Sequence, residues 1–134
     1  MSAFSIEVTE ADFEEKVIEA SKNVLVVIDL WAEWCGPCRV LGPVLERLAS
    51  AYQGKFILAM IDADENMRIA GRYAVRGFPT VIAFSDGQEV GRFSSAQSES
   101  TVRQFLDRLL PAVATATFQP FEREIKQRSQ PAAT

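Results

Sequence analysis

The segment that decides the fold spans residues 24–43 and reads Val-Leu-Val-Val-Ile-Asp-Leu-Trp-Ala-Glu-Trp-Cys-Gly-Pro-Cys-Arg-Val-Leu-Gly-Pro. It begins as an unbroken apolar run of strand length, rich in β-branched residues, and it continues into apolar residues at helical spacing. The two cysteines of the chain, Cys35 and Cys38, lie at the junction. The pattern predicts a strand that leads directly into a helix, with both thiols at the start of that helix.

The position of Cys35 favours its thiolate form. The first turn of a helix has unpaired N–H groups and the positive end of the macrodipole, and both stabilise a negative charge. Cys38 follows three residues later on the same helical face, within reach of a mixed disulfide formed at Cys35. Pro37 suits the first helical turn, and Gly36 allows the backbone of a substrate to approach closely. The spacing therefore predicts dithiol–disulfide exchange.

Further positions in the chain agree with this motif. Residues 29–33 read Asp-Leu-Trp-Ala-Glu and residues 34–38 read Trp-Cys-Gly-Pro-Cys, and together they strongly resemble the thioredoxin family. Pro43, inside the predicted helix, and Gly-Phe-Pro-Thr at residues 77–80 add to the resemblance. The resemblance covers about residues 4–110, and it implies an α/β thioredoxin fold, in which helices flank both faces of a central mixed β-sheet.

The resemblance also implies roles for individual residues. Asp29 lies in the apolar strand, where burial raises the pKa of a carboxyl, and it corresponds to the family's buried aspartate, which transfers the proton of Cys38. Pro79 corresponds to the family's cis-proline, whose loop lies against the cysteines. Trp31 is equally consistent with plain packing and with shaping the site. The residues expected to contact a substrate around Cys35 are Trp34, Gly36, Pro37, Gly77, Phe78 and Pro79.

Two positions depart from the family pattern. Many thioredoxins have a buried lysine near the aspartate, and counting along the strand at residues 55–61 places Met60 there. Without a cationic partner, desolvation predicts a further rise in the pKa of Asp29. Ser95 stands where the family usually has glycine, and its extra side chain is expected to alter the docking of a substrate or of a reductase.

The periodicity of the remaining chain predicts an alternation of strands and helices. Thr9 is expected to cap the first helix, with Asp12 at its third position, and Asp86-Gly87 is a hairpin signal. This order predicts parallel pairings through crossovers and one antiparallel hairpin. The expected strands are residues 4–8, 24–30, 56–61, 80–84 and 89–93, and the expected helices follow Thr9 and span 35–51, 65–73 and 98–110.

Composition excludes several classes of function. The chain has 134 residues, a net charge of −4 and no histidine. The acidic balance shows no footprint for nucleic acid or an anionic membrane. Histidine-dependent catalysis is excluded, and two cysteines do not supply the four ligands of a structural zinc site within one chain. Because no nucleotide-binding fingerprint is present, we expect a monomeric enzyme without metal or cofactor.

The length fits a single domain, for which we expect residues 1–110, followed by a linker-like extension at residues 111–134. The first residues lack the basic start and apolar core of a secretory signal, and no run is long enough to cross a bilayer, so we expect a cytoplasmic protein. In the extension, Phe118, Phe121 and Ile125 fall at helical spacing. Such a segment is either a tail or helix belonging to this domain, or a docking segment for a partner.

The sequence supports two functional interpretations. The leading one is a protein-disulfide reductase of the thioredoxin type, in which Cys35 attacks a client disulfide and Cys38 resolves the mixed disulfide. Its partners would be disulfide-containing client proteins and an electron donor resembling thioredoxin reductase. The alternative is a thioredoxin-fold chaperone or co-chaperone module that binds unfolded clients and has secondary redox activity. We favour the reductase because the Trp-Cys-Gly-Pro-Cys motif is complete.

Overall fold

A five-stranded mixed sheet forms the centre of the computed structural model, which describes residues 3–117 and the side chains of residues 3–110. The strand order is β1-β3-β2-β4-β5, so β1 and β5 form the two edges. Strand β3 runs parallel to β1 and β2, whereas β4 runs antiparallel to β2 and β5. The strands are β1 (Ser5–Glu7), β2 (Leu25–Trp31), β3 (Phe56–Asp62), β4 (Thr80–Ser85) and β5 (Gln88–Ser94).

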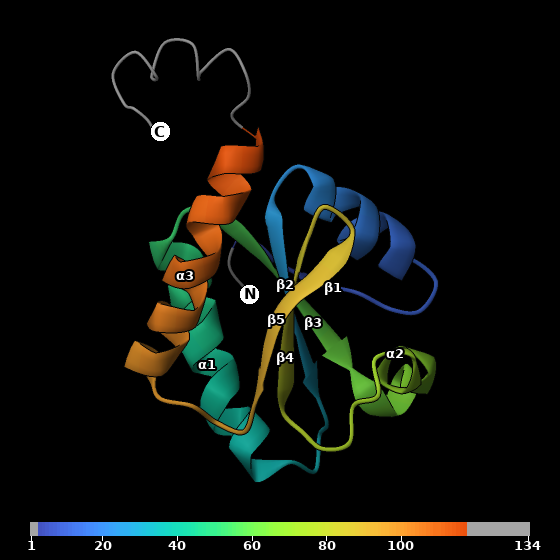
Figure 1. Cartoon of the computed structure of the whole chain (residues 1–134). Helices are drawn as coiled ribbons and strands as arrows, with labels where there is room; N and C mark the ends of the chain where they lie inside the picture. Colours follow the sequence, from blue (N-terminus) through green and yellow to red (C-terminus); the bar gives the residue numbers. More distant parts are fainter. Residues whose placement is uncertain (1–2, 118–134) are drawn as a thin grey trace, which may run out of the picture.

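Helices cover both faces of the sheet, which confirms the predicted fold class (Figure 1). One face is covered by α1 (Gly36–Ala51) and α3 (Glu99–Thr117). The other face is covered by a π-helical turn, η1, and by α2, with two short 3₁₀ turns, η2 and η3, beside them. The bounds of these four elements are η1 (Glu14–Glu19), η2 (Ala20–Lys22), η3 (Ala63–Glu65) and α2 (Met67–Arg72).

The central strand β2 is buried on both faces, as its unbroken apolar sequence predicts. Leu25 and Val27 pack with α1 and α3 in one hydrophobic cluster. Val26 and Ile28 belong to a second cluster on the opposite face, with residues from η1 and α2. Strand β2 ends at Trp31, and α1 begins at Gly36. The carboxyl end of this central strand therefore positions the two cysteines at the start of α1.

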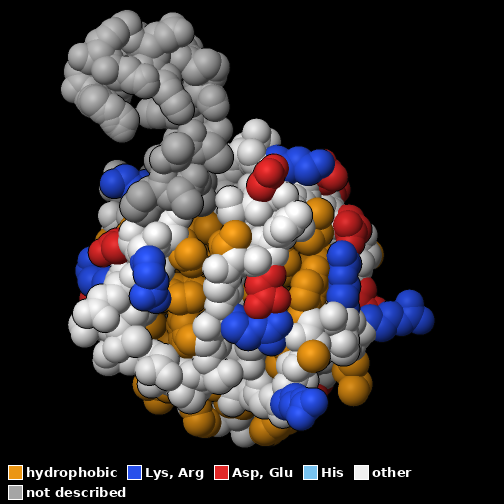
Figure 2. Space-filling view, in the orientation of Figure 1, with side chains coloured by type: hydrophobic (Ala, Val, Ile, Leu, Met, Phe, Trp, Pro, Cys, Tyr) orange, Lys and Arg blue, Asp and Glu red, His pale blue; other side chains and the backbone are white. Residues whose placement is uncertain are grey.

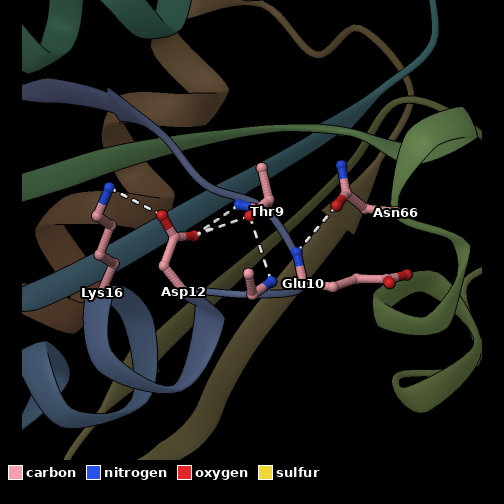
Figure 3. A network of polar contacts seen from close by, with 6 residues as sticks. Thr9, Glu10, Asp12, Lys16 and Asn66 are labelled. Atoms are coloured by element: carbon pink, nitrogen blue, oxygen red, sulfur yellow. Dashed lines mark hydrogen bonds and ion pairs between the residues drawn. The ribbon is translucent and has the colours of Figure 1, made fainter.

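The segment after β1 differs from its prediction. The Thr9 N–H donates to Oδ1 of Asp12 (2.7 Å), and the Ala11 N–H donates to the Thr9 hydroxyl (3.2 Å) (Figure 3). These bonds resemble the predicted cap, but the regular helical turn begins only at Glu14. The segment is also held from outside, because the Glu10 N–H donates to Oδ1 of Asn66 (2.9 Å) (Figure 3). This long-range bond satisfies an N–H that the first turn of a helix would leave without a partner.

The helix predicted at residues 65–73 is divided in two at Asn66. Asn66 is buried, and its amide accepts from Glu10 and donates to the Asp62 carbonyl (2.9 Å), which holds its backbone away from helical angles. The helix therefore starts at Met67, and Ile69 takes the buried position. Met67, the first residue of this helix, is 69% exposed.

Helix α3 continues past the predicted end at residue 110 and runs to Thr117. Proline in a helix removes a hydrogen bond, but its fixed φ is compatible with helical geometry, so Pro111 does not end the helix. In α1, Pro43 is likewise internal, as predicted, but Val40 lies on the exposed side. The residues of the predicted terminal segment, Phe118, Phe121 and Ile125, lie outside the described part of the chain.

Candidate active site

Cys35 caps the N-terminus of α1, and Cys38 lies in the first turn of the same helix. The two residues form a disulfide, with their Cα atoms 5.3 Å apart. The Cys38 N–H donates to the Cys35 sulfur over 3.1 Å, so a backbone donor of the helix end points at this sulfur. Both cysteines are largely buried. The geometry supplies the helix-end stabilisation of a Cys35 thiolate that the sequence predicts.

Asp29 is a buried carboxyl on β2, only 1% exposed. Neither carboxylate oxygen has a hydrogen-bond partner among the described residues. Burial, and secondarily the negative charge of Glu46 on α1, raise the pKa of Asp29 from 3.8 to about 7. Met60 lies opposite Asp29 in the register of β2 and β3, at the position where the sequence comparison with the family expected a lysine. The raised pKa confirms the predicted direction.

A pocket of about 240 Å³ joins Asp29 to the second cysteine. Its buried walls include Asp29 and Cys38, and Trp31 and Met60 also line it. The indole Nε1 of Trp31 is buried and has no hydrogen-bond partner among the described residues. The carboxyl with the raised pKa and Cys38 therefore line one shared pocket.

The loop before β4 lies against the disulfide from the other side. The Phe78–Pro79 peptide bond is cis, as the family resemblance implies. Phe78 packs against a small cluster that includes both cysteines. The Thr80 hydroxyl donates to the Gly77 carbonyl (2.7 Å), and the Ser95 N–H donates to the Pro79 carbonyl (3.1 Å). Hydrogen bonds from β4 and from the segment after β5 thus hold the loop beside the cysteines.

Trp34 is the most prominent apolar side chain at this end of the molecule and is 68% exposed. Its ring meets Phe78 edge to face, with centroids 6.0 Å apart, and its Nε1 donates to Oδ2 of Asp64 (2.9 Å). Open space lies where a side chain at Gly36 or Gly77 would begin. Figure 2 shows hydrophobic side chains exposed at the lower end of the molecule, where α1 begins in Figure 1. Of the predicted contact positions, Trp34, Gly36 and Pro37 flank Cys35 in the chain, and Phe78 packs against the cysteines and Trp34.

Three contacts of the site were not predicted from the sequence. Asp64 falls in an acidic run that predicts helix caps, so its bond to Trp34 has no local signal. The Arg39 side chain donates to the Glu33 carbonyl (2.8 Å) at the start of α1. Glu46, two helical turns from Cys38, acts on Asp29 across the helix–sheet interface. Each contact depends on folded proximity, which local patterns do not report.

The chain is similar to known proteins over most of its length. A family model described as Thioredoxin matches residues 4–108 of the chain. The chain belongs to the thioredoxin family. It is 44% identical to thioredoxin from Pseudomonas aeruginosa over 107 residues, which is 80% of this chain and 97% of the relative. It is 41% identical to thioredoxins from Chlorobaculum thiosulfatiphilum and Staphylococcus aureus, over 75% and 78% of this chain and 92% and 97% of the relatives.

Family membership and the paired cysteines give the function in general terms. This thioredoxin-family protein is a thiol–disulfide oxidoreductase and a protein-disulfide reductase, and it acts on disulfide substrates with electrons from a reductase donor. A chaperone module, the alternative raised by the sequence, is not favoured. Within residues 3–117, no helix is long and apolar enough to span a membrane, and no cluster of three acidic, cysteine or histidine side chains is placed to hold a metal ion.

Proposed function

We propose that Cys35, Cys38 and Asp29 carry the reduction in distinct roles. The Cys35 thiolate attacks a client disulfide and forms a mixed disulfide, while one client sulfur leaves as a thiolate. Cys38 then gives its proton to Asp29 and attacks the Cys35 sulfur. This second step releases the other client sulfur and leaves the oxidised Cys35–Cys38 pair, which a reductase reduces again.

The single observation that carries these roles is the position of the disulfide between two different environments. The Cys35 sulfur accepts a helix-end N–H, and Cys35 directly follows the exposed Trp34 in the chain. Cys38 lines the pocket that also holds Asp29. A carboxyl whose pKa is about 7 both accepts and releases a proton near neutral pH, which suits a general acid–base group.

We propose that the apolar surface around Cys35 binds the client segment. The exposed Trp34 and the half-buried Phe78 beside it offer aromatic area, and Gly36 and Gly77 leave room for a client backbone. The residues that we propose contact the client also include Pro37 and Pro79. The partners are disulfide-containing proteins and a donor of the thioredoxin-reductase kind, and a cytoplasmic location agrees with the reducing direction. Residues 1–110 form the redox domain, with residues 111–134 as its extension.

The experiment that tests the roles uses the two cysteines as matched controls for each other. Reduction of insulin by dithiothreitol is measured with the wild type, Cys35→Ser and Cys38→Ser. We expect strong acceleration by the wild type and none by either variant. In a second incubation without dithiothreitol, reduced Cys38→Ser should accumulate a mixed disulfide with insulin, because no second thiol resolves it, whereas Cys35→Ser should accumulate none. A mixed disulfide that forms at Cys38 instead would reverse the roles.

A further inference from the structure

The pocket behind the disulfide is separate from the surface assigned to the client. Of the two cysteines, only Cys38 lines it. None of the six residues proposed to contact the client lines it either. The residues proposed to hold a client at Cys35 are therefore not walls of this pocket.

The pocket contains buried polar atoms that require partners. Both carboxylate oxygens of Asp29 and Nε1 of Trp31 lack a partner among the described residues. A buried polar group left unpaired costs about 1–3 kcal/mol, so such groups are paired in stable proteins, by water where no side chain is near. A water molecule occupies about 30 Å³ in the liquid, so a pocket of about 240 Å³ has room for several.

The pocket reaches solvent beside the start of α1. Glu33 and Arg39 line it and are the exposed members of its walls, whereas Asp29 and Cys38 lie at its buried end. The Arg39 guanidinium donates to the Glu33 carbonyl (2.8 Å) and so ties the first turn of α1 to the loop that follows β2. This tie borders the opening. Met60 lines the pocket from β3, opposite Asp29.

We propose that this pocket is a water-filled proton port with its own opening beside Arg39, through which Asp29 and Cys38 exchange protons with solvent while a client is attached to Cys35. The inference rests on the proposed function and deepens it. It makes Met60 and Arg39 positioning residues, which shape the water path without touching the reacting sulfurs.

The resolving step balances with such a port. Cys38 passes its thiol proton to Asp29, and the new Cys38–Cys35 bond forms as the bond between Cys35 and the client sulfur breaks. The client sulfur leaves with the electron pair of that bond as a thiolate and takes a proton from solvent. Asp29 then releases the proton of Cys38 through the pocket. The client disulfide is reduced, the dithiol is oxidised, and no other reactant is required.

The first test follows proton exchange at Asp29 without any turnover. Oxidised protein is transferred from H2O to D2O at about pH 6, where Asp29 is protonated and an ordinary carboxyl is ionised, and the infrared band of the acid C=O is recorded. Asp29→Asn assigns the band. We expect the wild-type band to shift within the mixing time. Met60→Phe, which fills the pocket, should slow the shift at least tenfold, whereas Met60→Leu should not.

The second test attaches a client. In Cys38→Ser, a peptide is held by a disulfide to Cys35, and the same exchange is measured with and without the peptide. A separate port predicts equal rates. Exchange that is ten times slower with the peptide attached would overturn the proposal. A folded Met60→Phe variant that exchanges the Asp29 proton at the wild-type rate would also overturn it. If Met60→Phe does not fold, Arg39→Trp covers the opening from an exposed position, with Arg39→Lys as its control.

Kinetics separate this proposal from the proposed function. Met60→Phe should slow the release of a fluorescent client from Cys35 about tenfold and leave the alkylation rate of Cys35 by iodoacetamide unchanged. Equal slowing of both rates would indicate a general disturbance of the site and overturn the port. A protein that reduces insulin, but in which an attached peptide blocks exchange, refutes the port and leaves the reductase roles standing.

Discussion

Asp29 is the residue through which pH acts on the stability of the fold. Its pKa is about 7 in the folded protein and near 3.8 in an unfolded chain, because burial and Glu46 disfavour its charge. The stability contributed by the neutral carboxyl is complete below pH 3.8 and is lost as the pH rises to about 7. At about 1.4 kcal/mol per pKa unit, the loss is on the order of 4 kcal/mol.

Asp29→Asn should remove this dependence. From pH 4 to pH 8, the free energy of unfolding should decrease in the wild type by about 4 kcal/mol more than in Asp29→Asn, because the amide of the variant does not ionise. Urea unfolding of the oxidised proteins measures both values. Asp86→Asn, in the exposed turn before β5, is the control and should keep the wild-type slope. An unchanged slope in Asp29→Asn would assign the dependence to other groups.

Ala74 and Ser95 hold backbone angles that favour glycine, with φ values of +55° and +69°. The left-handed region costs a side-chain-bearing residue about 1–2 kcal/mol, and glycine in turn loses about 0.5–1 kcal/mol through the unfolded chain. Ala74→Gly should therefore stabilise the protein by about 0.5–1 kcal/mol. Ser95→Gly should gain less, because the Ser95 hydroxyl accepts from the Gln97 amide (3.0 Å). Urea unfolding checks the order, which a destabilised Ala74→Gly would contradict.

At the scale of elements, Asn66 joins the segment after β1 to the start of α2. Asn66→Ala should lower the free energy of unfolding by about 2–3 kcal/mol, because the Glu10 N–H and the Asp62 carbonyl both lose a partner. Asn66→Asp keeps the acceptor for Glu10 and loses the donor to Asp62, so its loss should be smaller. Chemical unfolding of the two variants gives the comparison; equal losses would mean that the Glu10 contact contributes nothing to stability.

The elements differ in how well their own residues predict them. Strand β2 and helix α1 follow from local periodicity, since Leu25, Val27, Leu41 and Leu45 occupy buried positions at the expected spacing. The break at Asn66 does not, because the bond that causes it joins residues 56 positions apart. Pro111 misleads for another reason: proline weakens a helix but does not forbid one. Local sequence thus predicts elements where packing and propensity agree.

At the scale of the whole molecule, the domain and its extension are separable in principle. Leu109 and Leu110 are the last of the described side chains of α3, which end at residue 110, and both pack on the core; the family model ends at residue 108. A chain of residues 1–111 should keep the unfolding free energy and the insulin reductase activity of the full chain. A loss of either would give residues 112–134 a role in this domain, and pull-down comparison of the two chains would show any client that requires them.

The pairing of Cys35 with Cys38 and the burial of Asp29 could be predicted from the sequence, for a physical reason. Cys35 and Cys38 are close together in the sequence, so the redox motif can be recognised from the local sequence alone. Asp29 was found because a carboxyl in an apolar strand is costly. The pocket, the Trp34–Asp64 bond and the effect of Glu46 arise only when distant segments meet. These three features depend on the tertiary structure and could not be predicted from the local sequence.

The two edges of the sheet bear on how the protein behaves when crowded with its clients. Exposed strand edges act as templates for intermolecular β-pairing, and short or charged edges resist it. Edge β1 has only three residues, and edge β5 carries the ion pair of Glu89 and Arg92. A reductase opens disulfides and so releases chains that are prone to aggregate. Because one edge strand is short and the other is charged, both edges of the enzyme resist β-pairing with the chains that it releases.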